Sequence, residues 1–377
     1  MLTNMKIVDI FYVRYFTEDG SKLAIGGVET YITQLSRLIC DLGCKVRIFQ
    51  YADYDFEKRL DYATVYAYAN KKKKNKAFLF NKAKLLYEKG NKYLTIIGSD
   101  IITPNFKVDN SIAINHGIYW DSNRNRGLKL IVDFIIRQIR AYPIVKRVQN
   151  VDEVVCVDNN FICWYRTQTS YRNVKLTPIL NFADIGPEKT DKPEKIIKIV
   201  FARRFVGIRG THLFTPIAKR LLEKYPNIEI TFAGSGPEED YMRNILNGID
   251  RVNFTKYQSD ESLKFHSQFN IAVVPTLYSE GTSLSLLEAM SAHCAVVCTN
   301  IGGMTNVILD YYNGLMVSPN EEELFEALCK LIDDKKFREK IGQNGYNTIK
   351  NSFSLAKWEE KWKDVINRNF QNSKLYV

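Results

Sequence analysis

Short apolar runs alternate with amphipathic helical segments along the whole 377-residue chain. In the first cycle, an apolar run at 6–13 precedes a segment at 28–43 whose apolar residues recur every three or four positions, and a second apolar run follows at 44–52. Strand–helix–strand cycles of this kind form parallel sheets that helices cover on both faces. Because the chain is long for one domain, we expect an α/β protein with two doubly wound, Rossmann-like domains.

The composition is that of a globular protein with an anionic partner. Hydrophobic residues make up 45% and charged residues 25% of the chain, which is ordinary, but the net charge of +11 indicates binding of a nucleotide diphosphate, an acidic lipid surface or nucleic acid. No run of 18 apolar residues occurs. The start of the chain, residues 1–16, is interrupted by Asp9 and Arg14 and lacks a cleavage site, which argues against a signal peptide. The seven cysteines form no CxxC pair, which predicts reduced, mostly buried thiols of a cytosolic protein and no metal site.

The stretch 275–303 carries the most informative motif. Two carboxylates, Glu280 and Glu288, bracket a Gly/Thr/Ser turn between the end of an apolar strand and the start of a helix. Ligands of open α/β sheets bind at this end of the strands, and the free N–H groups of 281–284 favour an anion there. Two acids beside an anion site are costly unless they bind uncharged hydroxyls, so the pattern indicates a sugar joined to a diphosphate.

Three further features follow strand ends. The strand that opens the second domain is followed by a basic loop with Arg203, Arg204 and Arg209, whose guanidinium groups suit diphosphate oxygens. Gly26–Gly27 precedes the first helix, where backbone N–H groups could meet phosphate or the glycines could simply permit a turn. His116 stands at the carboxyl end of a middle strand and is a candidate functional residue.

A strongly basic segment, Lys71–Lys92, contains nine lysines against one acid, Glu88, with apolar residues interleaved. This composition is typical of an interfacial amphipathic segment on anionic lipid and equally of a solvated basic loop and helix. Nucleic-acid binding is a third interpretation, but no nucleic-acid motif accompanies the lysines, so we do not expect it.

Together these residues resemble the retaining glycosyltransferases of family 4, which have the GT-B fold. The motifs follow the family's order over nearly the whole chain: Gly-Gly, His-Gly, Arg-x5-Gly, the AGSGP turn, Glu-x7-Glu followed by Ala-Met, and Asn-Gly-Leu. The resemblance implies an acceptor-binding domain at 1–185 and a nucleotide-sugar-binding domain at 186–355, facing each other across a cleft. It also implies a last helix at 356–377 that packs back on the first domain.

The resemblance also implies roles for individual residues. Arg204 and Arg209 match the pair that clamps the diphosphate, although the family has Lys at the second position, and Arg203 is an alternative to Arg204. Glu280 would bind donor-sugar hydroxyls, and His116 would lie beside the transferred sugar. The implied catalytic residues are Glu280, Arg204, Arg209 and His116.

The implied donor-binding residues serve the other parts of the nucleotide sugar. The glycine pair would approach the diphosphate or leave room for the acceptor, the backbone N–H groups of the turn would bind phosphate, and Glu288 would bind ribose hydroxyls. They are Gly26, Gly27, Gly281, Thr282, Ser283, Leu284, Glu288 and Arg203. His293 replaces a common Gly, and a left-handed backbone there would be strained.

The implied function is retaining transfer of a sugar from a UDP- or GDP-sugar to a saccharide or lipid-linked acceptor in surface glycan biosynthesis. Because two arginines and a helix N-terminus can stabilise the departing diphosphate, we expect neither a metal nor a resident cofactor. The expected location is the cytoplasm, with peripheral attachment to the inner membrane face through the basic segment. The alternatives are a non-catalytic, nucleotide-sugar-binding partner subunit and a GT-B-fold nucleotide-sugar epimerase.

Overall fold

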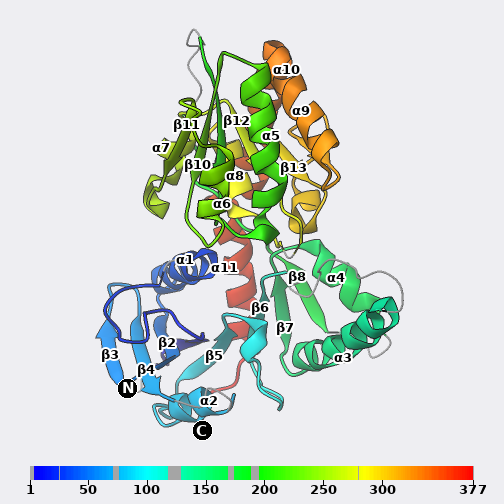
Figure 1. Cartoon of the computed structure of the whole chain (residues 1–377). Coiled ribbons are helices and arrows are strands. Elements are labelled where there is room, and N and C mark those ends of the chain that lie inside the picture. Colours follow the sequence, from blue (N-terminus) through cyan, green and yellow to red (C-terminus); the bar gives the residue numbers. More distant parts are fainter. Residues whose placement is uncertain are drawn as a thin grey trace. The chain divides into compact units, whose positions relative to one another are not determined.

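The computed structural model describes residues 4–24, 26–70, 76–117, 129–168, 174–187, 195–278 and 280–376. These residues form two compact units, each built on a predominantly parallel sheet with helices on its faces (Figure 1). The predicted α/β class with two doubly wound domains is confirmed.

The first unit contains an eight-stranded sheet in the order β3-β4-β2-β1-β5-β6-β7-β8. All neighbouring strands are parallel except β3 and β4, which form an antiparallel pair at one edge. The elements are β1 (Lys6–Phe11), α1 (Gly27–Asp41), β2 (Lys45–Ala52), β3 (Phe56–Arg59), β4 (Thr64–Ala69), α2 (Phe78–Lys84), β5 (Lys92–Ile97), η1 (Asp100–Ile102), β6 (Ser111–Asn115), α3 (Lys129–Gln149), β7 (Glu153–Cys156), α4 (Asn159–Arg166) and β8 (Lys175–Pro178).

The second unit contains a six-stranded, fully parallel sheet in the order β11-β10-β9-β12-β13-β14. Its elements are β9 (Ile197–Ala202), η2 (Gly207–Arg209), α5 (Thr211–Lys224), β10 (Ile228–Ala233), α6 (Glu239–Ile245), β11 (Val252–Thr255), η3 (Ser259–Glu261), α7 (Ser262–His266), β12 (Ile271–Val274), α8 (Leu284–Ser291), β13 (Ala295–Thr299), η4 (Gly302–Asn306), β14 (Leu315–Val317), α9 (Glu321–Asp333), α10 (Lys335–Thr348) and η5 (Ile349–Phe353), followed by α11 (Leu355–Asn372).

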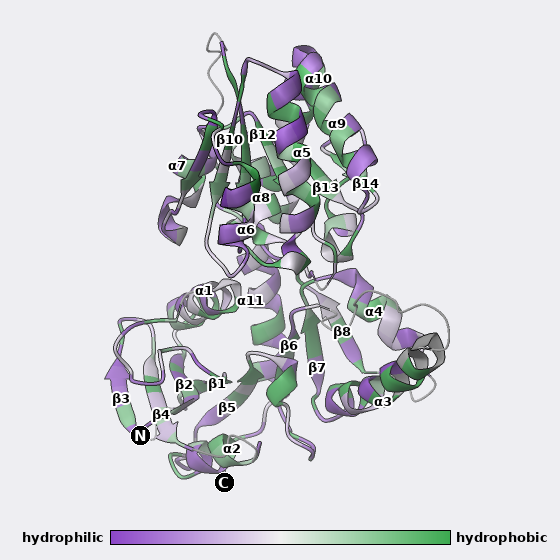
Figure 2. Cartoon of the chain, in the orientation of Figure 1, coloured by the Kyte–Doolittle hydropathy of each residue, from purple (hydrophilic) through white to green (hydrophobic). Residues whose placement is uncertain are grey.

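Both faces of the second sheet are buried, which explains why its central strands are continuously apolar. In β9, Ile199 and Phe201 belong to one hydrophobic core, whereas Val200 and Ala202 belong to the core on the opposite face. Side chains alternate between the faces of a strand, so a strand covered by helices on both sides needs apolar residues at every position. Figure 2 shows hydrophobic residues along central strands such as β10 and β12.

A buried ion pair joins the first two strands. Asp9 in β1 lies directly beside Arg47 in β2, with Nε–Oδ1 and Nη2–Oδ2 distances of 2.7 and 2.8 Å. Burial raises the pKa of Asp9, and the guanidinium of Arg47 opposes this rise. The ring faces of Tyr87 and Tyr93 lie 5.5 and 5.4 Å from that guanidinium. The charge that interrupts the apolar run of β1 is therefore paired inside the core.

The last helix returns to the first unit, as predicted. From Glu359 onward, α11 belongs to that unit. The fully buried Trp362 donates its Nε1–H to the Tyr31 hydroxyl at 2.8 Å, and the Arg368 guanidinium contacts the Glu153 carboxylate.

The boundaries between the units differ from those predicted at 185 and 355. The chain leaves the first unit after Ile179, and the second unit extends to Trp358. Ala183, which precedes the predicted boundary at 185, is buried in the second unit, and its N–H donates to the Phe353 carbonyl at 3.0 Å. Burial of this short apolar stretch moves the boundary toward the N-terminus.

The basic segment Lys71–Lys92 is partly described, because residues 71–75 lie outside the described ranges. Within α2, Leu79 and Phe80 are buried in the first unit. These two side chains are therefore core residues and are unavailable to a lipid surface, in contrast to the interfacial interpretation, whereas Leu85 is 80% exposed.

All seven cysteines are free, and five of them are buried, as predicted from the absence of paired spacing. Over the ranges that the structure describes, none of the helices has the length and apolarity that a membrane span requires.

Candidate functional site

The second sheet reverses the direction of its winding between β9 and β12. Along the chain, β9, β10 and β11 extend the sheet in one direction, and β12, β13 and β14 extend it in the other. The loops after β9 and β12 therefore leave the sheet at the point where the winding reverses, which is where doubly wound sheets bind ligands. These two loops contain Arg203–Arg209 and Pro275–Ser283.

One carboxylate oxygen of Glu280 joins the two loops. Its Oε2 accepts hydrogen bonds from Arg203 Nη2 at 2.6 Å and Thr276 Oγ1 at 3.2 Å, and Arg209 Nη1 contacts the same atom. The side chains of Arg203 and Glu280 are 5% and 11% exposed, so water screens this ion pair only weakly. The structure thus brings together an acid and two guanidinium groups that lie more than 70 residues apart in sequence.

Arg203 is held by close packing of its backbone. Its N–H donates to the Ala233 carbonyl at 3.0 Å, and a Cβ at Gly234 would lie 2.0 Å from the Arg203 carbonyl oxygen. The Nη1 atom of Arg203 is buried and has no hydrogen-bond partner among the described residues. A buried guanidinium N–H without a partner favours binding of a further acceptor atom beside Glu280.

Arg209 is positioned by the turn that starts α5. Gly210 has φ of +84°, and a Cβ there would lie 1.9 Å from the Pro275 carbonyl oxygen. The Leu277 N–H donates to the Ile208 carbonyl at 3.0 Å, which ties the two loops together. Burial lowers the pKa of Arg209, and Glu280 opposes this while the neighbouring arginines add to it.

Arg204 takes a different position. Its side chain is exposed, and within the described ranges it makes no hydrogen bond or ion pair with Glu280. The sequence left open whether Arg203 or Arg204 completes the pair with Arg209, and in the structure Arg203 is the one that contacts Glu280. Arg204 remains close enough to lower the pKa of Arg209 electrostatically.

The turn at 281–284 lies against a second glycine pair, Gly302 and Gly303. Gly302 has φ of +58°, and the Gly303 N–H donates to the Glu280 carbonyl at 3.1 Å. A Cβ at Gly303 would lie 2.5 Å from the Thr282 nitrogen. Only glycine allows this approach, so the pair at 302–303 fixes the backbone that follows Glu280.

Helix α8 starts directly after this turn. Ser283 is its N-cap residue, but the serine side chain makes no capping hydrogen bond and instead lies 3.2 Å from the Ser285 hydroxyl. The first-turn N–H groups of a helix have no intrahelical partners and carry the positive end of the helix dipole. The start of α8, with Leu284 as its first residue, therefore favours an anion beside Arg203 and Arg209.

Glu288 lies on α8, away from the ion pair. Burial raises the pKa of its carboxyl, a hydrogen bond with Ser262 lowers it, and the charge of Asp184 raises it further. Burial and, after it, the charge of Glu288 raise the pKa of Tyr257, so this tyrosine lies near the Glu288 carboxylate. No described contact joins Glu288 to Glu280, so the two acids occupy separate environments, as separate roles would require.

In the first unit, His116 stands at the end of β6 and contacts the end of β5. Its Nε2 lies 2.8 Å from the Gly98 carbonyl oxygen, and its ring packs edge-on against Tyr31 at 5.6 Å. A carbonyl can only accept, so Nε2 carries the proton and Nδ1 is an acceptor. Burial lowers the pKa of His116 to about 4, so the ring is neutral at pH 7.

The lowered pKa of His116 predicts that the stability of the protein depends on pH. Because its folded pKa is about 4 and its unfolded value is 6.5, the unfolded state binds more protons between these values, and stability falls as pH falls through that window. His266, with a pKa also lowered to about 4, contributes in the same window. We expect His116→Gln to reduce the slope of unfolding free energy against pH by up to about 1.4 kcal/mol per pH unit. Urea titrations from pH 4.5 to 7.5 measure this, with His266→Gln as the matched variant, and an unchanged slope would contradict burial of a neutral His116.

The glycine pair at the start of α1 faces a carboxylate that the sequence analysis did not single out. A Cβ at Gly26 would lie 2.3 Å from Glu29 Oε2, and the Tyr12 hydroxyl donates to Glu29 Oε1 at 2.9 Å. The signal was available, since an acid in the first turn of a helix after Gly-Gly opposes an anion there. Gly26 itself has φ of 173°, which any residue can adopt, so space and not backbone conformation is what it provides.

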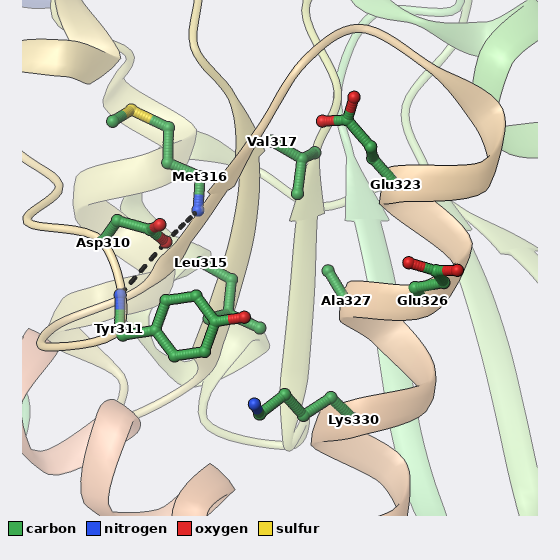
Figure 3. A pocket seen from close by; sticks show the side chains of 9 residues that line it. All are labelled: Asp310, Tyr311, Leu315, Met316, Val317, Glu323, Glu326, Ala327 and Lys330. Atoms are coloured by element: carbon green, nitrogen blue, oxygen red, sulfur yellow. Dashed lines mark hydrogen bonds between the residues drawn. The ribbon is translucent and has the colours of Figure 1, made fainter.

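A pocket of about 380 Å³ lies elsewhere in the second unit, between α9 and the edge strand β14 (Figure 3). Asp310 Oδ1 accepts from the backbone N–H groups of Tyr311 and Met316 at 3.1 and 2.9 Å. None of its nine lining residues is a predicted site residue.

Throughout the described ranges, His, Cys, Asp and Glu form no cluster of three that could hold a metal ion.

The decisive comparison is with a family model. Residues 184–348 match the model described as "Glycosyl transferases group 1", and this region contains every second-unit residue predicted for the site. The chain carries a group 1 glycosyl transferase domain. The predicted family and enzyme class are thereby confirmed at the level of this group.

Two curated relatives agree with this assignment. The chain is 25% identical to the uncharacterized glycosyltransferase MJ1069 of Methanocaldococcus jannaschii over 294 residues, covering 73% of this chain and 72% of that one. It is 29% identical over 170 residues to the capsular polysaccharide biosynthesis glycosyltransferase CapM of Staphylococcus aureus, covering 43% of this chain and 44% of CapM. The chain thus spans less than half of CapM's length.

The structure of Anabaena Alr3699/HepE in complex with UDP-glucose superposes with a TM-score of 0.72 at 15% identity, covering 97% of this chain and 100% of that one. This likeness supports the GT-B fold that the sequence predicts.

Proposed function

We propose that this group 1 glycosyltransferase moves a sugar from a nucleoside diphosphate donor, a UDP- or GDP-sugar, to a saccharide or lipid-linked acceptor. The observation that carries the proposal is the carboxylate oxygen of Glu280 that Arg203 and Arg209 both contact, at the position where the second sheet reverses its winding. An acid that can accept from sugar hydroxyls and two cations that can pair with phosphates fit a donor in which sugar and diphosphate are joined.

The negative charge that develops on the leaving group accounts for the proposed role of Arg203 and Arg209. Transfer breaks the bond between the anomeric carbon and a phosphate oxygen, and the electron pair of that bond stays on the diphosphate. Fixed cations stabilise this charge most in a weakly screened site, and Arg203 and Arg209 have side chains only 5% and 24% exposed. With the N-terminus of α8 beside them, they supply the stabilisation that a metal ion supplies elsewhere, so we propose that transfer needs no metal.

Retention of configuration is proposed to follow from attack on the same face of the sugar. The acceptor hydroxyl oxygen bonds to the anomeric carbon, and its proton passes to the departing phosphate oxygen. Glu280 is a poor nucleophile for a covalent intermediate, because three donors engage its Oε2. We assign it instead to accepting hydrogen bonds from donor-sugar hydroxyls.

The first unit is proposed to bind uncharged hydroxyl groups rather than phosphate. The Glu29 carboxylate beside Gly26 disfavours an anion at the start of α1, which supports the interpretation that Gly26 and Gly27 leave room for the acceptor. The neutral imidazole of His116 can accept a hydrogen bond through Nδ1 without adding charge.

The names of similar proteins support the donor and the process. HepE has been crystallised with UDP-glucose, and CapM acts in capsular polysaccharide biosynthesis. We propose a corresponding role in surface glycan synthesis, on the cytoplasmic side of a membrane, where the seven free cysteines would stay reduced.

The experiment is a donor panel with the purified chain, assayed with and without EDTA. We expect one nucleoside diphosphate sugar to raise the melting temperature and to be consumed with an acceptor, with equal rates in EDTA and an unchanged anomeric configuration in the product. Stabilisation by a nucleotide without any turnover would indicate a non-catalytic partner subunit. Epimerised sugar without acceptor would indicate an epimerase, and loss of activity in EDTA would refute metal independence.

A further inference from the structure

Helix α3 (Lys129–Gln149) has two apolar faces, and among the residues that the structure describes only one of them is buried. Its C-terminal half is buried in the first unit through Ala141, Ile144, Val145 and Val148, each at most 6% exposed. Other large apolar side chains on the same helix are open to solvent: Val132 (55% exposed), Ile135 (51%), Ile136 (37%), Ile139 (66%) and Tyr142 (57%). We call these five the outer face of α3.

The outer face lies opposite the buried one. Its residues stand at positions i, i+3, i+4, i+7 and i+10, which at 100° per residue cover roughly 120° of the helix circumference. By the same geometry, the buried residues centre on the other side of the helix. The exposed side chains are therefore a second stripe rather than the margin of the core, and contiguous apolar surface of this kind marks an interaction site. Figure 2 shows hydrophobic and hydrophilic residues side by side along α3.

The charges on α3 indicate what the outer face binds. The helix sequence contains five basic residues and one acid, Asp133. Arg140 and Lys146 are exposed, and the Lys146 ammonium lies 5.5 Å from the Tyr142 ring. Arg147 is directed to Asp100, 3.9 Å away, and takes no part. An apolar stripe with exposed cations beside it is the arrangement that anionic lipid headgroups and the underlying acyl chains attract.

Pairing with a second copy of the chain is less favourable. Because a two-fold interface places the same patch on both partners, it would bring the exposed Arg140 and Lys146 of two copies into one interface, where their positive charges repel. Over its described residues, the 21-residue helix is not long and apolar enough to cross a membrane, so the proposed contact has it lying in the plane of the surface.

We propose that the outer face of α3 binds the surface of an anionic lipid bilayer, with the five apolar side chains in the headgroup–acyl boundary and Arg140 and Lys146 at the phosphates. This replaces α2, whose Leu79 and Phe80 are buried, as the apolar part of a membrane contact. The proposal rests on the proposed function only for its purpose, which is access to a lipid-linked acceptor. The binding itself does not depend on transfer.

The test is flotation of the full chain with vesicles of phosphatidylcholine alone and with vesicles containing phosphatidylglycerol. We expect recovery mainly with the anionic vesicles. The variant that combines Ile135→Ser and Ile139→Ser should bind the anionic vesicles at least about 10-fold more weakly. Arg140→Glu should weaken binding to anionic vesicles only. The matched control is Leu309→Ser, which removes an apolar side chain of similar exposure (65%) from the second unit and should leave binding unchanged.

Equal recovery with both vesicle types, or equal binding by the serine variant, would overturn the proposal. Sedimentation of the same proteins provides the second outcome: a dimer that the serine changes dissociate, without vesicle binding, would make the outer face a self-association surface and would also overturn it. The melting temperature of each variant is also measured with and without a nucleoside diphosphate. Because none of the proposed donor-binding residues lies on α3, the nucleotide should raise the melting temperature of every variant equally, whatever the result with vesicles, and this separates failure of the membrane proposal from failure of the proposed function.

Discussion

Glu280→Gln is expected to lower the rate of sugar transfer by about 100-fold while strengthening the binding of a free nucleoside diphosphate. In the structure, the Glu280 carboxylate pairs with Arg203 and Arg209. A diphosphate that binds these arginines must compete with Glu280 for them. Loss of the negative charge removes this competition and should tighten diphosphate binding about 5-fold, roughly 1 kcal/mol. The sugar, however, loses a charged acceptor for its hydroxyls.

The opposite signs of the two effects make the assignment testable. Initial rates measure transfer, and titration calorimetry with UDP and GDP measures binding to the same protein. Glu326→Gln is the matched control, because it neutralises an exposed acid elsewhere in the second unit and should change neither quantity. A folded Glu280→Gln protein that binds both nucleotides more weakly than the unsubstituted chain would show that Glu280 holds the arginines in place rather than competing for them.

Gly210→Ala is expected to destabilise the second unit by about 3 kcal/mol or more and to reduce transfer by about 100-fold. Two separate costs combine at this position. The backbone has φ of +84°, and the new Cβ would meet the Pro275 carbonyl oxygen at 1.9 Å. Relief of that overlap requires the loop of Arg209 and the loop that leads to Glu280 to move apart, so the shared contact should be lost.

Gly248→Ala separates the two costs. Gly248 has φ of +76° but nothing within 4 Å of its Cβ position, so the substitution should cost only about 1 kcal/mol and leave transfer intact. Urea unfolding followed by circular dichroism measures both variants. Equal destabilisation by the two substitutions would mean that the approach of Pro275 to Gly210 is not a constraint on the loop.

Local patterns in the sequence were informative where an element is buried on both faces. The apolar runs predicted at 6–13 and 44–52 correspond to β1 and β2 within a few residues of those limits. The antiparallel strands β3 and β4 were not anticipated. The sequence of β3 is FEKR, half-exposed at an edge of the sheet, and such strands need few apolar residues and so show little periodicity.

The sequence predicted which residues of the site lie in loops after strands, but not which of their side chains contact one another. That Glu280, Arg203, Arg204 and Arg209 follow strands is visible in the sequence, and the carboxyl ends of parallel strands share one edge of a sheet. The choice between Arg203 and Arg204 depended on the packing of one backbone against Gly234, which leaves Arg203 buried and Arg204 exposed. The Glu29 carboxylate beside Gly26 was likewise a matter of side-chain placement.

By itself, the sequence determined the alternation of strands and helices, the order of the family's motifs and the excess of positive charge, because these depend on residues that are neighbours along the chain. The tertiary structure alone decided that two arginines share one oxygen of an acid 77 and 71 positions away. It also decided that Leu79 and Phe80 lie in the core while the outer face of α3 lies in solvent. An amphipathic pattern states that a face is apolar, but which partner covers that face depends on the order of strands in the sheet, and this order is a property of the assembled chain.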